Sequence, residues 1–123
     1  MKTMKHCTLP LTIAALAAAA PAWAQNVSAG KAVFAQCAAC HAISATHGVG
    51  PGLANVLGRK AGSAAGFRYS PAMKRTALTW DAKTLDSYLR DPQAAVPGNT
   101  MPFSGLGDDK QRADLIAYLA TLQ

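Results

Sequence analysis

Cys37-Ala38-Ala39-Cys40-His41 is the stretch of sequence that decides how this chain folds. Two cysteines three positions apart, with a histidine directly after the second, form the C-x-x-C-H pattern of covalent haem attachment. One turn of helix brings residues three apart onto the same face, so both sulfurs can reach the two vinyl groups on one edge of a porphyrin. His41 can then bind the iron. The pattern predicts one haem c, attached covalently through Cys37 and Cys40.

Two other interpretations of the cysteine pair are weaker. A thioredoxin-like redox pair would need an α/β unit around it, and no strand pattern flanks these residues. A structural zinc site needs four ligands, but after His41 the chain has only His47 and no further cysteine. The pattern therefore favours haem attachment over a redox dithiol or a zinc site.

The first 24 residues have the composition of a secretory signal peptide. Lys2 and Lys5 precede an apolar, alanine-rich run, and Ala22-Trp23-Ala24 fits a small-x-small cleavage site. The apolar run is shorter than the ~20 residues that a helix needs to span a bilayer. We therefore expect residues 1–24 to be cleaved and residues 25–123 to form one periplasmic domain of a bacterial protein, without an integral membrane anchor.

The remaining chain is small and basic. Because Lys2 and Lys5 belong to the leader, 10 basic residues face six Asp and no Glu, a net charge of +4. The basic residues lack the interleaved aromatic side chains of nucleic-acid-binding surfaces, so we expect an acidic protein partner and no nucleic acid. A domain of about 100 residues without disulfides needs a further source of buried apolar surface, and the porphyrin would supply it.

Hydrophobic periodicity and capping signals predict an all-α fold. Four helices are expected: from residue 27 to the haem motif, over residues 71–75, over residues 81–90, and from residue 108 or 109 into the C-terminal region. In the same order, their expected N-caps are Ser28, Ser70, Asp81 and Asp108. Segments 42–65 and 92–107 are rich in glycine and proline and are predicted to be loops. Loops of this length are unusual in a small domain unless they wrap something, and a flat porphyrin fits that role.

The second face of the iron has three candidate ligands, His47, Met73 and Met101. His47 lies only six residues beyond His41 and should stay on the same side of the ring. Met73 fits ordinary packing on a predicted helix. Met101 lies in the rigid stretch Pro97-Gly98-Asn99-Thr100-Met101-Pro102, where a methionine has little packing to do, and a thioether raises the reduction potential of a haem iron. We therefore predict His41 and Met101 as the two axial ligands.

Together these residues resemble a known family. From Val27 to Leu122 the chain is similar to class I c-type cytochromes of the mitochondrial-like type, which include the bacterial cytochromes c2. The resemblance is carried by the haem motif and by Gly30, Phe34, Gly50-Pro51, Leu53, Gly58-Arg59-Lys60, Gly66-Phe67-Arg68-Tyr69, Trp80, Leu85, Tyr88-Leu89, Pro92, Pro97-Gly98, Met101, Phe103 and Asp114-Leu115-Ile116-Ala117-Tyr118-Leu119. It implies a small fold of helices and long loops around one haem, in which the first and last helices cross at Gly30 and Tyr118.

The resemblance also implies roles for single residues on the histidine side and around a haem propionate. Pro51 would accept a hydrogen bond from Nδ1 of the iron-bound His41, which orients the ring. Arg59, Tyr69 and Trp80 would surround a buried propionate and keep it ionised.

On the methionine side, the resemblance implies three further neighbours of the haem. The hydroxyl of Tyr88 would approach the sulfur of Met101, and Phe103 would shield the exposed haem edge. Asn99 departs from the family, because it stands where a threonine helps to hold a buried water. We count Asn99 among the cofactor-binding residues.

An iron closed on both faces transfers electrons and transforms no substrate of its own. We therefore expect a monomeric electron carrier, not an enzyme, that cycles between Fe(III) and Fe(II). By resemblance, its partners would be a quinol:cytochrome c oxidoreductase upstream and a terminal oxidase or peroxidase downstream, in a respiratory or photosynthetic chain. Positions that hold docking lysines in the family hold Gln93, Ala94 and Thr100 here.

Other functions remain open at this stage. The missing lysines leave room for a dedicated electron acceptor or subunit of one periplasmic dehydrogenase. A haem peroxidase or small-ligand binder would need an open iron and distal acid–base groups, for which the chain offers only His47 and no Glu. A thiol–disulfide oxidoreductase would carry free thiols and no haem.

Overall fold

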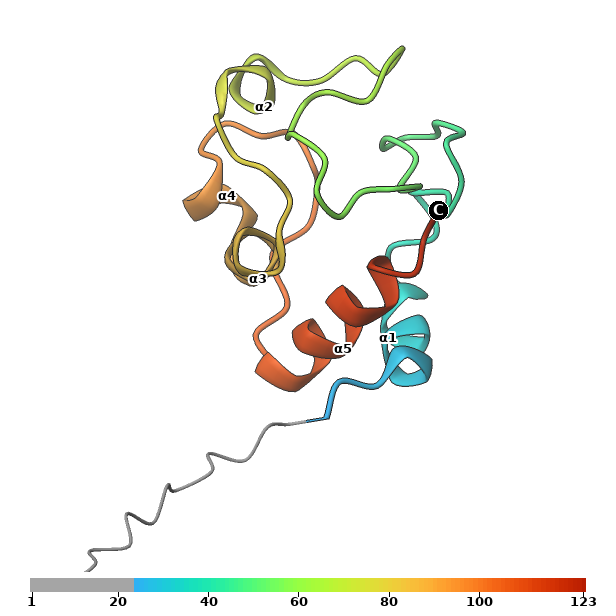
Figure 1. The fold of residues 1–123 in the computed structure, drawn as a ribbon. Coiled ribbons are helices and arrows are strands. Elements are labelled where there is room, and N and C mark those ends of the chain that lie inside the picture. Colours follow the sequence, from blue (N-terminus) through green and yellow to red (C-terminus); the bar gives the residue numbers. More distant parts are fainter. Residues whose placement is uncertain (1–23) are drawn as a thin grey trace, which may run out of the picture.

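The computed structural model describes residues 24–123, so the predicted signal peptide lies outside the described residues except for Ala24. Five helices follow one another along this part of the chain: α1 Val27–Phe34, α2 Pro71–Arg75, α3 Ala82–Arg90, α4 Pro92–Ala95 and α5 Asp109–Leu119. Residues 24–123 form no strand, and one isolated bridge pairs Lys60 with Thr79. The prediction of an all-α fold is confirmed (Figure 1).

Helices α1 and α5, the first and last of the described residues, pack against each other (Figure 1). At Gly30 a Cβ atom would lie 1.9 Å from the carbonyl oxygen of Asp114, so only glycine permits this close crossing. Beside it the rings of Phe34 and Tyr118 pack with centroids 5.4 Å apart. The expected crossing of the first and last helices at Gly30 and Tyr118 is therefore confirmed.

The predicted start of the first helix needs a correction. Asn26, not Ser28, is the N-cap of α1, and its side chain accepts a hydrogen bond from the backbone N–H of Ala29. The backbone N–H of Asn26 donates to the carboxylate of Asp114 at 2.8 Å, which holds Asn26 in the extended conformation of a cap. A contact with the far end of the chain thus decides between two good capping residues.

The loop predicted over 92–107 also needs a correction, because its first residues form α4. Pro92 suits the first position of a helix, and the side chain of Asp91 caps the turn by accepting from the N–H of Ala94. The predicted caps Ser70, Asp81 and Asp108 all accept bonds from the backbone at the starts of α2, α3 and α5.

The buried core lies between the helices and the long loops. The apolar stripe predicted for the last helix is buried, with Leu115, Ile116, Leu119 and Leu122 each at most 8 % exposed. Figure 1 shows the first part of the long loop of residues 42–65, in teal, on the side of the molecule opposite α3 and α4. Its later residues 58–61 are hydrogen-bonded to residues 78–80, directly before α3. None of the helices in residues 24–123 is long and apolar enough to cross a membrane.

Candidate functional site

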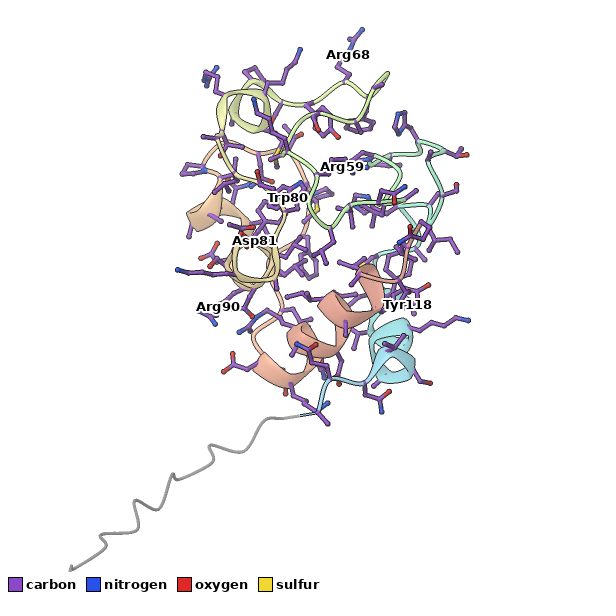
Figure 2. All side chains as sticks on the ribbon, in the orientation of Figure 1. Arg59, Arg68, Trp80, Asp81, Arg90 and Tyr118 are labelled. Carbon is purple, nitrogen blue, oxygen red and sulfur yellow. The ribbon has the colours of Figure 1, made fainter. Side chains whose placement is uncertain are left out.

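One large cavity collects the residues that the sequence singled out. All eleven predicted site residues line it: Cys37, Cys40, His41, Pro51, Arg59, Tyr69, Trp80, Tyr88, Asn99, Met101 and Phe103. They come from the segment after α1, from the long loop, from the segments directly before α2 and before α3, from α3 itself and from the loop between α4 and α5. Figure 2 shows Arg59 and Trp80 near the middle of the molecule, whereas Arg68 and Arg90 point outward from its edge.

The two cysteines lie in a turn that continues the path of α1. The backbone N–H groups of Cys40 and His41 both donate to the carbonyl oxygen of Cys37, at 3.1 and 3.0 Å. This i→i+3 and i→i+4 pattern is that of one helical turn, and both half-buried cysteines line the cavity. Burial raises the pKa of the Cys37 thiol, and the neighbouring Cys40 adds to the rise. The reactive cysteine of a redox dithiol typically has a lowered thiol pKa instead.

The imidazole of His41 is held in one tautomer. Its Nδ1 lies 2.8 Å from the carbonyl oxygen of Pro51, which can only accept, so Nδ1 carries the proton. The lone pair is then on Nε2, the nitrogen available to bind a metal. Gly50 packs against the ring, and a Cβ there would lie 2.4 Å from Cε1 of His41. The loop that supplies Pro51 therefore fixes both the proton and the orientation of the ring.

His47 does not have a free nitrogen for a metal. Its Nε2 donates to the carbonyl oxygen of Ala65 at 2.8 Å, and its Nδ1 accepts from the N–H of Gly52 at 3.1 Å. Both ring nitrogens are therefore used to join two stretches of the long loop. Among residues 24–123, no group of three or more histidine, cysteine or acidic side chains is arranged to hold a metal ion.

Met101 lies beside the buried side chains of Tyr88 and Asn99. The Tyr88 hydroxyl approaches the sulfur of Met101 at 3.9 Å and the side-chain oxygen of Asn99 at 3.5 Å. Burial raises the pKa of Tyr88 to about 12, so the hydroxyl keeps its proton at neutral pH. Trp80 packs on the Tyr88 ring with centroids 4.9 Å apart.

Arg59 is a half-buried cation whose buried Nε lacks a hydrogen-bond partner. Nη1 and Nη2 donate to the carbonyl oxygens of Ala54 and Gly52, each at 3.1 Å. Its Nε is buried without a partner, and no acidic side chain of the described residues forms an ion pair with it. A buried N–H donor without a partner is costly, and an acceptor with negative charge is the best partner for the N–H of a guanidinium. The cavity is thus complementary to a carboxylate on an otherwise apolar ligand.

These features fit a haem c. Cys37 and Cys40 supply two thiols at thioether spacing, and His41 and Met101 offer a nitrogen and a sulfur. The unsatisfied Nε of Arg59 matches the carboxylate of a haem propionate.

The rest of the cavity is formed by residues that were not chosen as site residues. They are Phe34, Gln36, Val49, Gly50, Leu53, Val56, Phe67, Ser70, Met73, Leu85, Leu89, Thr100, Pro102, Leu115 and Leu119. The helical period marks Leu85, Leu115 and Leu119 as buried but does not say whether a buried side chain faces a cofactor or another helix. Val49 and Val56 lie in the long loop, where no periodic signal exists.

Comparison with known proteins supports the same interpretation. The sequence model of the family described as Cytochrome c matches residues 27–123. The chain is 50 % identical to cytochrome c2 of Rhodomicrobium vannielii over 121 residues, which cover 96 % of this chain and 97 % of that protein. It is 48 % identical to cytochrome c of Tetrahymena pyriformis over 98 residues, and this match covers 79 % of this chain and 89 % of that protein. Among solved structures, cytochrome cH from Methylobacterium extorquens aligns with a TM-score of 0.76 and 46 % identity, over 78 % of this chain and 98 % of that one.

Proposed function

Because this chain belongs to the cytochrome c family, we propose that four of its side chains hold the haem c: the sulfurs of Cys37 and Cys40, the imidazole of His41 and the thioether of Met101. The protein carries electrons on covalently bound haem c and is not an enzyme. The observation that carries the proposed ligand set is the meeting of all four side chains at one cavity. When bound, the haem supplies an iron that alternates between Fe(III) and Fe(II).

The residues around this site have separate tasks in the proposal. Pro51 keeps the proton on Nδ1 of His41, so that Nε2 can bind the iron. Arg59 offers the positive charge and the free Nε–H that an anionic propionate requires. Tyr88 keeps its hydroxyl proton beside the sulfur of Met101. Phe103 lines the same cavity, where it would shield the exposed haem edge. Tyr69 and Trp80 line the same cavity as Arg59 and would surround that propionate with it.

Membership of this family also supports a proposal for the location and the partners of the protein. We propose that residues 1–24 direct export and are removed, and that residues 25–123 act in the periplasm as a monomer. The protein works with redox partners, and we propose a quinol:cytochrome c oxidoreductase as donor and a terminal oxidase or peroxidase as acceptor.

A dedicated partnership with one periplasmic dehydrogenase is the second candidate. The observation in its favour is that Gln93, Ala94 and Thr100, near Met101, are exposed and uncharged. A carrier that docks through charge should react more slowly with its partner as salt increases. Salt dependence of reduction by a quinol complex and by candidate dehydrogenases therefore separates the two candidates.

Two methionines line the cavity, and the same substitution in each tests the ligand assignment. Met101→Leu should remove the weak far-red absorption band of methionine-bound ferric iron, lower the reduction potential and allow carbon monoxide to bind, because it removes a soft sulfur ligand. Met73→Leu nearly conserves the volume of a buried side chain and should leave the spectrum unchanged. Visible spectra of both variants check this. An unchanged band in Met101→Leu, or its loss in Met73→Leu, would remove Met101 from the proposed ligand set.

A further inference from the structure

Asn99 is a buried polar residue whose side chain uses all of its hydrogen-bonding groups. It is 6 % exposed. The side-chain nitrogen donates to the carbonyl oxygens of Pro92 at 2.8 Å and Val96 at 2.9 Å. The side-chain oxygen accepts from the backbone N–H of Met101 at 3.1 Å. A single carboxamide therefore joins both ends of α4 to the residue proposed as iron ligand.

The elements around Asn99 cannot hold Met101 by themselves. Helix α4 has four residues, too few for a helix to be stable without tertiary contacts. The other hydrogen bonds of Met101 are one from Phe103 N–H to its carbonyl oxygen at 2.8 Å and the long contact of its sulfur with Tyr88. Asn99 thus supplies the bond between the Met101 backbone and the end of α4.

The geometry requires a carboxamide and no other common side chain. The group must donate two hydrogen bonds to carbonyl oxygens and accept one from an N–H at the same time. Aspartate would place a second oxygen against two carbonyl oxygens, and a hydroxyl has only one hydrogen to donate. Leucine has the size but none of the bonds.

We propose that Asn99 is a positioning residue that keeps Met101 at the iron by tying its backbone to the carbonyl groups of α4. The proposal rests on the proposed ligation by Met101. Loss of the Asn99 carboxamide frees the Met101 backbone and raises the fraction of time that Met101 is away from the iron. If Asn99 only stabilised the loop, its loss would affect Met101 no more than the loss of another side chain that supports the same loop.

Gln93 provides a matched control in the same loop. Its side chain donates to the backbone oxygen of Asn99 at 2.9 Å and accepts from the N–H of Gly98 at 3.2 Å, so it also supports the loop but has no hydrogen bond to Met101. Asn99→Leu and Gln93→Leu both replace a carboxamide by an apolar group. A purely structural role of the loop bonds predicts similar effects for the two variants.

The test uses the exported protein with its haem and has two measurements. The first is the hydrogen-exchange rate of the Met101 amide proton in the reduced protein, and the second is the affinity of the ferric protein for added imidazole, which binds when Met101 leaves. Asn99→Leu should raise both by about tenfold, the factor expected for losing one or two buried hydrogen bonds, and Gln93→Leu by less than about twofold. Asn99→Thr, which keeps an acceptor near the Met101 N–H, should lie between wild type and Asn99→Leu and serves if Asn99→Leu does not fold.

Each outcome bears on one proposal. Equal effects in the Asn99 and Gln93 variants, or no change in the Asn99 variants, overturn the role of Asn99. If the wild-type protein lacks the far-red band, the proposed ligation fails instead, and the exchange rate of the Met101 amide still decides whether Asn99 positions that backbone.

Discussion

Single residues decide whether the cavity can accept a haem. The Nδ1–H of His41 is bonded to the backbone carbonyl of Pro51, which leaves Nε2 for a metal. The Nε–H of Arg59 has no partner in the protein and is left for a ligand. Gly50 matters for a different reason, since the absence of a side chain lets the His41 ring lie directly against the loop. A single donor group, or the absence of one side chain, is therefore enough to determine how the cavity can bind a haem.

We predict that Gly50→Ala displaces the His41 ring and destabilises the protein by about 1–3 kcal/mol, the usual cost of overpacking. The new methyl group would lie 2.4 Å from Cε1 of His41, which no relaxed structure tolerates. Denaturant unfolding measures the loss, and the visible spectrum reports any change at the iron. Gly107→Ala is the control, because a Cβ there meets nothing within 4 Å. Equal stabilities of the two variants would contradict the close packing of Gly50 and His41.

Elements of the fold are joined by a cluster of charged residues where α3 meets α5. Arg112 is fully buried and forms ion pairs with Asp86 and Asp109, and its Nη1 donates to the carbonyl oxygen of Leu106. Arg90 contacts the same two acids but its side chain is 56 % exposed. Arg112 therefore ties α3, α5 and the end of the Met101 loop together from the inside.

We predict that Arg112→Leu destabilises the protein by about 2–4 kcal/mol, because it leaves Asp86 and the Leu106 carbonyl without a buried partner. Arg90→Leu removes an exposed cation from the same acids and should cost less than about 1 kcal/mol. Thermal or denaturant unfolding of the two variants compares them directly. A larger loss for Arg90→Leu would show that the burial of Arg112 contributes nothing.

The start of α1 depends on a carboxylate of α5, and this makes one part of the stability sensitive to acid. Hydrogen bonds from Lys110 and from the N–H of Asn26 hold the pKa of Asp114 below its ordinary value. The folded pKa is lower than the unfolded value of about 3.9, so the contribution is complete above that value and is lost as pH falls through the folded pKa.

Replacing Asp114 by Asn should therefore lower stability at pH 7, and the difference from wild type should shrink as pH falls below about 4. Urea unfolding over a pH series measures this difference. Asp91→Asn keeps a capping oxygen at the start of α4 and should follow the wild-type pH profile more closely. A difference between Asp114→Asn and wild type that is the same at every pH would rule out the carboxylate of Asp114 as its source.

The elements also show how far sequence reasoning reaches. Ser70-Pro71 and Asp81 carry local capping signals strong enough to place α2 and α3, and the structure confirms both. Asn26 and Ser28 are equally good caps by local chemistry, and only the contact with Asp114 decides between them. Helix α4 was missed because four residues carry no periodic pattern. Asp91-Pro92 is a local signal for the start of a helix, but the prolines and glycines that follow it favour the prediction of a loop.

At the scale of the whole molecule, helices and long loops surround one cavity that is lined mainly by apolar side chains. The haem motif predicts the contents of the cavity, and the family resemblance predicts which residues line it, including Arg59 and Trp80. The apolar residues from the long loop could not be chosen from sequence, since their exposure depends on how the loop wraps around the interior. The direct bonds of Asn99 to α4 could not be foreseen either, because they depend on the conformation of the loop after that helix.

The intact mass of the exported protein tests the central claim, covalent attachment of haem c through Cys37 and Cys40, most directly. The account predicts the mass of residues 25–123 plus one haem, retained after denaturation and removal of free haem. The double variant Cys37→Ala/Cys40→Ala should yield little folded protein and no covalent haem, because the cofactor forms much of the core. A wild-type mass equal to that of the bare polypeptide would contradict the account.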